Sequence, residues 1–352
     1  MKKAALLFLV LLSGLILAVS TSNTVMEAIF TFRNSSEPLK TDKYYYGDLF
    51  GMSYLPRFKM KLEVSSSVSK GGCDCPRSIH LFIAGDSYLG DQFVKSDDIF
   101  CGVGKLGFLR VNFPEKQVIL LDTTTTNILL VETVERGLRF FKNPEYLTGK
   151  LLFERPGVDC SPRAVNARVK RMLFNEINRN LEFNLFSYSV FTPIKELKAS
   201  LNYRFFKRIS GDVCIAPDSS MLLYLPTVDS LSECSSFFPI ADEEIDSIVQ
   251  SLNDIHRYYT QRGFDEVYFS MIPNPVSVLY PGLGTYNELI PRLQCNSSLK
   301  MPLIDAYDLF RAAHRRIYFD NDTHWNMNGF TLWLNECNKK LERHCSSTAM
   351  QD

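Results

Sequence analysis

The sequence predicts a three-layer α/β/α sandwich built on a mainly parallel sheet, with an irregular insertion in the middle of the chain. Short apolar runs with the length and composition of buried strands occur at 79–84, 118–121 and 128–131. Segments with helical spacing of apolar residues occur at 132–141, 242–262 and 327–342. Strands that alternate with helices along the chain are typical of α/β folds.

The N-terminus has the layout of an export signal. Lys2 and Lys3 precede an apolar run from Ala4 to Val19, and small polar residues follow it. The run is about 16 residues long, short of the roughly 20 that span a bilayer, and Ala18-Val19-Ser20 suits a cleavage site. Residues 1–24 are therefore either a cleaved signal peptide or a retained anchor that contacts the membrane. Both alternatives predict an exported protein, in the periplasm or at the cell surface.

The rest of the chain divides into an approach segment and one large domain. Residues 25–72 form a polar, aromatic-rich approach segment, and residues 73–345 form the α/β domain. Within that domain, residues from about 150 to 235 are irregular enough to be an insertion or a cap. We expect helices around 164–180 and 194–206 there, and a hairpin at 213–226.

The C-terminal third returns to regular α/β patterns. The helix over 242–262 begins with acidic residues and stops at Gly263, the charge bias and the cap expected of a helix. Residues 265–272 follow as a strand, and 304–310 begin another unit. The last helix, over 327–342, places Phe330, Trp333 and Leu334 on one face.

Composition excludes some functional classes and leaves others open. Of 352 residues, 45% are hydrophobic and 22% are charged, as in ordinary globular proteins. The 39 basic residues balance 39 acidic ones, so we expect no nucleic-acid partner.

Nine cysteines are compatible with an oxidising compartment, and their odd number leaves at least one without a partner in the chain. Cys337 and Cys345 are interpreted as a local disulfide or as two inert thiols. We expect no metal and no cofactor.

A candidate nucleophile follows the first strand. The strand ends at Gly85, and Ser87 falls at the turn just beyond the carboxyl edge of the predicted sheet, where sites of α/β proteins collect. The backbone N–H of Ser87 lies near a helix start, where an oxyanion can be held.

A candidate acid–base pair lies far away in the sequence. Asp322 and His324 are two residues apart in a polar turn before the last helix, a spacing at which the carboxylate can orient the imidazole. The second ring nitrogen can then take the proton of a serine. Among five histidines, His324 alone lies in a loop beside such an acid. The structural alternative is that Asp322 caps the helix.

Together the strings Gly85-Asp86-Ser87 and 322–326 (Asp-Thr-His-Trp-Asn) resemble the SGNH, or GDSL-like, hydrolases. They are most similar to the exported branch of alginate O-acetylation proteins, which carries an Asp-x-His-Trp motif. The resemblance implies an acyl-serine enzyme that transfers or hydrolyses acetyl or other acyl groups of cell-envelope polysaccharide. It also implies a membrane-bound O-acyltransferase as a partner. The motif order differs from the alginate branch, because here the serine comes first.

The usual SGNH acid, three residues before the histidine, is replaced by Asn321. The orienting acid is therefore expected to be Asp322, with Asp320 as the fallback.

The resemblance calls for further donors and ligand contacts. Asn274, directly after the strand 265–272, is the expected oxyanion donor. The alternative is that Asn274 is only a turn residue between two prolines. Tyr286, Asn287 and Tyr88 are expected to contact the polysaccharide, with packing as the alternative. No Gly-rich second motif stands out. A second functional hypothesis is therefore a non-catalytic carbohydrate-binding or scaffold subunit on the same fold.

Overall fold

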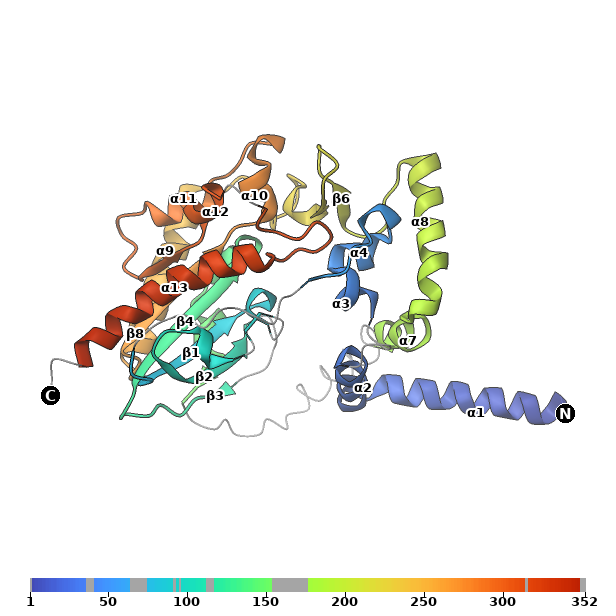
Figure 1. Cartoon of the computed structure of the whole chain (residues 1–352), viewed down its shortest axis with the longest axis horizontal. Coiled ribbons are helices and arrows are strands. Elements are labelled where there is room, and N and C mark those ends of the chain that lie inside the picture. The colour runs from blue at the N-terminus through green and yellow to red at the C-terminus, as the bar shows by residue number, and fades with distance from the viewer. Residues whose placement is uncertain are drawn as a thin grey trace. The chain divides into compact units, whose positions relative to one another are not determined.

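The structure is a computed structural model that describes residues 2–35, 41–63, 75–90, 93–94, 96–111, 117–153, 177–313 and 316–348. It divides into two compact units (Figure 1). The first comprises Met1–Leu62 and Pro156–Val213, and the second comprises Glu63–Arg155 and Cys214–Asp352. Part of the expected insertion therefore groups with the N-terminal residues, and the α/β unit resumes at Cys214.

The second unit is built on a five-stranded sheet in the order β2-β1-β4-β8-β9. Every neighbouring pair in this sheet is parallel, as the sequence predicts. Its strands are β1 (Ile79–Gly85), β2 (Val103–Arg110), β4 (Thr126–Val134), β8 (Glu266–Ile272) and β9 (Leu303–Asp305).

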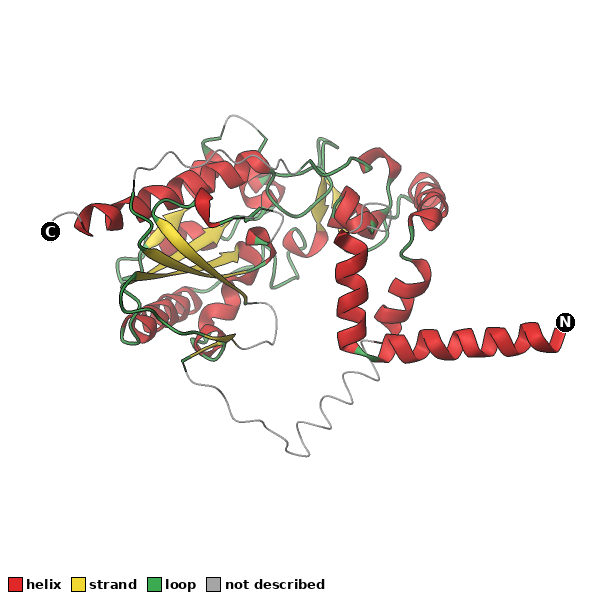
Figure 2. Ribbon diagram, turned by 60° about the horizontal axis from the view of Figure 1, so that its bottom comes forward, coloured by secondary structure: helices red, strands yellow, loops and turns green. Residues whose placement is uncertain are grey.

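Helices cover both faces of this sheet, which makes three layers (Figure 2). Successive side chains of β1 point to opposite faces, so Leu81 and Ile83 join one core and Phe82 and Ala84 join the other. The first core includes apolar residues of α13 (Met327–Thr348), and the second includes those of α9 (Asp242–Thr260). A strand buried on both faces contains a continuous apolar run, as residues 81–84 of β1 and 128–131 of β4 do.

Smaller elements complete the second unit. Two short sheets pair β3 (Gln117–Val118) with β5 (Leu151–Leu152), and β6 (Val213–Ile215) with β7 (Leu222–Tyr224). The other helices of the unit are α5 (Glu145–Thr148), α10 (Pro275–Leu279), α11 (Leu289–Gln294) and α12 (Tyr307–Arg311). The 3-10 helices are η3 (Ser87–Leu89), η4 (Asp97–Ile99), η5 (Glu135–Lys142), η8 (Leu225–Thr227) and η9 (Pro281–Leu283).

The described part of the first unit is helical. Its elements are α1 (Lys2–Thr21), α2 (Asn23–Ser35), α3 (Asp42–Tyr46), α4 (Asp48–Ser53), η2 (Pro56–Phe58), α7 (Ile177–Phe186), η7 (Ser189–Phe191) and α8 (Thr192–Phe206). Asn180 of α7 donates to the Ser20 carbonyl of α1 at 2.9 Å. The span Lys3–Thr21 is long and apolar enough to cross a membrane, a property that it shares with signal sequences.

The structure corrects several expected elements. The run at 118–121 does not enter the main sheet: Val118 belongs to β3, which pairs with β5, and Leu120 is 79% exposed. The strand at the edge of the main sheet beside β1 is β2. The helix expected at 132–141 is wrong at its start: residues 132–134 continue β4, since they pair with β8, and η5 follows. The expected helix 164–180 lies largely outside the described residues. The expected hairpin at 213–226 corresponds to β6 and β7.

A disulfide between Cys337 and Cys345 is not formed, because both thiols are free. They lie eight residues apart on α13, and a helix rises about 1.5 Å per residue, which separates them by about 12 Å. Disulfides require Cα atoms within about 7 Å.

Candidate active site

A tight turn after β1 presents Ser87 at the carboxyl edge of the sheet. The carboxylate of Asp86 shapes this turn by accepting from the backbone N–H groups of Tyr88, at 2.8 Å, and Val134, at 3.1 Å. The second bond joins the turn to the end of β4, the neighbouring strand. Ser87 is therefore held in place by its predecessor.

Three side chains of the predicted set form one hydrogen-bonded chain. Ser87 Oγ lies 2.8 Å from His324 Nε2, and His324 Nδ1 lies 2.5 Å from Asp322 Oδ1. Asp322 Oδ1 also accepts from the backbone N–H of His324 at 2.9 Å. With Nδ1–H donating to the carboxylate, Nε2 can accept the Ser87 proton, the arrangement needed for nucleophilic catalysis. Asp322 and His324 are both buried.

The fallback acid lies elsewhere. Asp320 Oδ2 pairs with Arg316 at 2.6 Å, and burial raises the pKa of Asp320. Asp322, and not Asp320, is thus the acid that contacts the imidazole.

Tyr88 supports this loop from the nucleophile side. Its hydroxyl donates to the backbone carbonyl of Thr323, and its ring centroid lies 4.8 Å from that of His324. Trp325 packs edge-on against the ring of Tyr88, with ring centroids 5.4 Å apart. Tyr88 is 0% exposed, so in this structure it positions His324 and presents no surface to a polysaccharide. These contacts agree with the packing role that was the alternative expectation for Tyr88.

Asn274 is turned into the core. It follows β8, and β4 lies between β8 and β1 in the sheet. Its amide Nδ2 donates to Ser236 Oγ at 3.0 Å, its backbone N–H donates to Glu135 at 2.9 Å, and the residue is 0% exposed. Its side chain is committed to the core, which disagrees with the expected role as oxyanion donor.

The other expected sugar contacts serve packing. Asn287 Nδ2 donates to the Phe238 carbonyl at 2.9 Å, and its Oδ1 accepts from the Leu289 N–H at 3.0 Å. Tyr286 stacks on Tyr307 with ring centroids 6.3 Å apart, and burial raises the pKa of Tyr286. Both side chains are engaged by their own unit, so the expectation that they contact the polysaccharide finds no support in this geometry.

Glu132, which follows the apolar run 128–131, lies directly beneath the turn that carries Ser87. It is wholly buried, and its Oε2 accepts from the backbone N–H of Asp86 at 3.0 Å. Burial, reinforced by the nearby Asp86 carboxylate, raises the pKa of Glu132 well above its ordinary value. The signal in the sequence is an acidic residue inside a buried apolar strand, a position that acids rarely occupy without a partner.

Arg136 adds positive charge near the same turn. Its guanidinium carbon lies 5.7 Å from the ring centroid of Tyr88 and 5.9 Å from that of Tyr224. It also opposes the rise in the pKa of Glu132.

Comparisons of the chain with known protein families, curated proteins and solved structures found no match.

Proposed function

We propose that the chain is an exported serine-dependent O-acyltransferase or esterase that acts on cell-envelope polysaccharide through an acyl-Ser87 intermediate. The observation that supports it is the chain of contacts from Ser87 Oγ through His324 to Asp322. Ser87 would attack an acyl carbonyl, His324 would accept the proton, and Asp322 would stabilise the imidazolium. His324 would then give this proton to the leaving oxygen of the acyl donor, which departs as an alcohol. Water or a sugar hydroxyl next attacks the acyl-serine, His324 accepts the proton of the attacker, and this proton passes to Ser87 as the acyl product leaves.

The proposed oxyanion site uses the backbone N–H of Ser87, because the amide of Asn274 is bound to Ser236. An oxyanion donor is worth about 3 kcal/mol in the transition state. The choice of acetyl groups and polysaccharide, and of a membrane-bound O-acyltransferase as partner, comes from the SGNH resemblance of Gly85-Asp86-Ser87 and 322–325.

The apolar helix α1 is compatible with export, either as a signal or as an anchor. Export would bring the site to the compartment of the envelope polysaccharides.

Labelling with a fluorophosphonate, followed by hydrolysis of acetyl esters, tests this function. Ser87→Ala should abolish labelling and His324→Ala should slow it strongly. Ser247→Ala on α9 is the matched control, since Ser247 Oγ donates only to the Glu243 carbonyl of its own helix among the described contacts. Undiminished labelling of Ser87→Ala would overturn the proposal. Incubation with an acetyl ester and an oligosaccharide then separates transfer, which acetylates the sugar, from hydrolysis, which releases acetate.

A non-catalytic scaffold on the same fold is the second candidate, and the burial of Asn274 favours it. This alternative predicts that the wild-type chain is not labelled, although it binds the polysaccharide.

A further inference from the structure

Helix α8 of the first unit carries apolar side chains on its outer face. Ile194, Leu197, Leu201 and Phe205 are 66%, 61%, 45% and 67% exposed. Their spacing by three and four residues aligns them along one face of the helix. In a surface helix of a globular protein such a stripe normally packs against the core. In α8 the apolar stripe instead faces away from the rest of its unit.

Polar contacts hold the opposite face of α8 inward. Thr192 Oγ1 donates to Asp42 Oδ2 at 2.6 Å, and Lys195 Nζ donates to the Tyr54 hydroxyl at 3.0 Å. Ala199, on the same inner face, is 5% exposed. These bonds fix the rotation of α8, and the apolar stripe therefore stays on the outside.

Basic residues flank the stripe. At about 100° per residue, Lys198 and Arg204 fall on its two sides, and both are exposed. Glu196 is the acidic residue of α8, and it pairs on the inner side with Lys59 at 2.8 Å. An apolar face with a basic border matches the boundary between acyl chains and anionic headgroups.

The same unit contains the apolar helix α1. Its span Lys3–Thr21 has a mean hydropathy of 2.5 and is 6% buried within the chain. Both views of the molecule show α8 running across the direction of α1 (Figures 1 and 2). If α1 crosses a bilayer, a helix that runs across its axis lies along the plane of that bilayer.

We propose that α8 lies in the surface of the anionic bilayer that α1 spans. The stripe of Ile194, Leu197, Leu201 and Phe205 enters the acyl region, and the flanking basic side chains contact lipid phosphates. The proposal requires that α1 is retained, and it is independent of the chemistry at Ser87. A lipid surface fits this face better than a protein partner because the membrane helix is in the same unit.

A tryptophan reporter on the full-length chain tests the proposal. Leu201→Trp is placed in the stripe, and Tyr203→Trp is the matched control on the opposite side of α8. The chain is reconstituted in vesicles of phosphatidylglycerol and phosphatidylcholine with brominated acyl chains, which quench nearby indoles. Trp325 and Trp333 are both buried in the second unit, and the parent chain measures their contribution. We expect quenching at position 201 to exceed that at 203 several-fold. Equal quenching, or none, would overturn the proposal, because α1 keeps every variant on the vesicle.

A second pair of measurements tests the two parts of the surface. Leu197→Glu in the Leu201→Trp background should reduce quenching by at least half, since it places a charge in the stripe. Vesicles of phosphatidylcholine alone should also reduce it, because they lack the charge that Lys198 and Arg204 would bind. Quenching that is unaffected by both Leu197→Glu and the loss of anionic lipid would contradict a surface position for α8.

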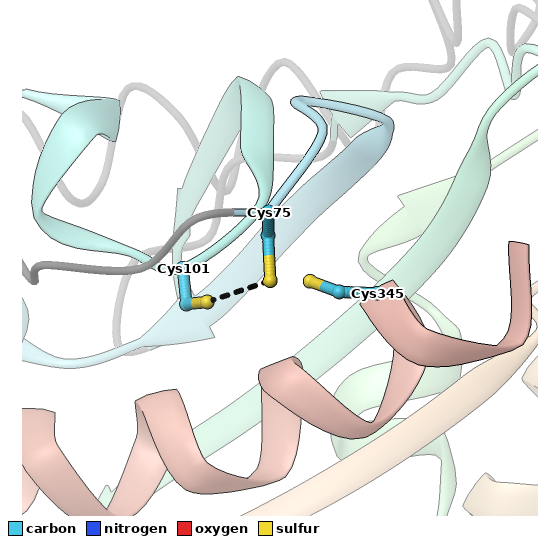
Figure 3. Close-up of side chains that lie close together, drawn as sticks. All are labelled: Cys75, Cys101 and Cys345. Carbon is cyan, nitrogen blue, oxygen red and sulfur yellow. Dashed lines mark hydrogen bonds between the residues drawn. The ribbon is translucent and has the colours of Figure 1, made fainter. Parts of the chain in front are cut away.

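An independent observation concerns three cysteines of the second unit (Figure 3). The sulfur atoms of Cys75, Cys101 and Cys345 all lie within 4.8 Å of one another. They come from the segment before β1, the turn before β2, and α13. Cys101 is disulfide-bonded, and its sulfur lies 3.4 Å from that of Cys75. Cys75 and Cys345 are free thiols.

The fold around this cluster permits unusually close contact. Gly102 has φ +69°, and a Cβ on it would lie 2.7 Å from Cys345 Sγ. Asn338, two turns earlier on α13, accepts from the Cys101 N–H at 2.8 Å and donates to the Ile99 carbonyl at 3.0 Å. The helix is thus locked against the turn that carries Cys101.

We infer that Cys75 and Cys345 join in a disulfide when the chain is in an oxidising compartment. Each thiol loses its proton, an S–S bond forms, and two electrons pass to a disulfide oxidant, which becomes a dithiol. The bond would tie the end of α13 to the start of β1. Bound metal is the competing outcome, but the bond already made by Cys101 leaves two thiols to bind it.

Peptide mass spectrometry on the exported chain, alkylated without reduction, tests this pairing. We expect a linked peptide that contains Cys75 and Cys345 and that disappears in Cys345→Ser. Cys337→Ser, a buried thiol on the same helix, should leave the linked peptide unchanged. Cys345→Ser should lower the Tm by several degrees, with no further loss on adding Cys75→Ser. Alkylation of both thiols in the native chain, or stoichiometric zinc, would contradict the inference.

Discussion

The carboxyl group of Glu132 accepts the backbone N–H of Asp86 at 3.0 Å, directly beneath the turn that carries Ser87. Asp86 in turn accepts from the N–H groups of Tyr88 and Val134. The candidate nucleophile is therefore positioned by two acidic residues, and burial raises the pKa of one of them, Glu132, well above its ordinary value.

The raised pKa of Glu132 predicts a pH-dependent stability. An unfolded Glu titrates near pH 4.3, whereas the folded group keeps its proton to higher pH. The folded state therefore binds more protons, and the free energy of unfolding falls as the pH rises above about 4.3.

Glu132→Gln, which carries no titratable proton, should flatten that fall between about pH 5 and pH 8. Urea unfolding at both pH values measures this change in the free energy of unfolding. Glu243→Gln, at an exposed position on α9, is the control and should leave the slope unchanged. A slope unaltered by Glu132→Gln would show that Glu132 is ionised in the folded chain.

Asp322→Asn should impair the proposed chemistry far more than folding. The amide cannot stabilise an imidazolium at Nδ1, and turnover of an acetyl ester should fall roughly 10³- to 10⁴-fold. Asp320→Asn is the matched control in the same loop, since Asp320 pairs with Arg316. It should keep turnover within a few fold. Equal losses in the two variants would remove Asp322 from its assigned role.

Tyr88→Phe should loosen the loop that carries His324. The variant keeps the aromatic packing and loses the hydroxyl bond to the Thr323 carbonyl, at a cost of about 1–3 kcal/mol in the free energy of unfolding. We expect a lower rate of Ser87 labelling as well. Tyr280→Phe, which removes the hydroxyl bonds to Asp218 and Ser220, should leave that rate unchanged. An unchanged labelling rate in Tyr88→Phe would limit Tyr88 to packing.

Gly329→Ala should destabilise the start of α13. A Cβ there would lie 2.5 Å from the Ile317 carbonyl oxygen and 2.8 Å from Trp325 Cβ, so backbone must move. Overpacking of this kind costs about 1–3 kcal/mol, measurable by urea unfolding. Gly282→Ala, where nothing lies within 4 Å of the added carbon, should change stability little. Similar stabilities of the two variants would mean that the backbone before α13 can shift to accommodate the added carbon at little cost in free energy.

The sequence was most informative where local pattern determines local structure. The apolar run of β1, the helical spacing of α9 and the turn at Ser87 are each encoded within about ten residues. The mainly parallel sheet followed from the same alternation of strands and helices, and the structure confirms it. Residue types also singled out His324 from four other histidines.

Tertiary pairing decided what those patterns left open. Residues 132–134 have helical spacing, yet hydrogen bonds to β8 hold them in a strand. Asn274 follows a strand at the expected edge of the sheet, yet its amide is bound by Ser236 in the core.

By itself, the sequence determined the α/β class and located the turn that carries Ser87 and the loop that carries Asp322 and His324, because backbone propensity and side-chain periodicity act over short distances. Only the tertiary structure decided that Ser87 meets His324 across 237 residues, that Asp322 and not Asp320 contacts the imidazole, and that Glu132 supports the turn. Such contacts depend on which strands become neighbours, and strand order is set by the packing of the whole unit.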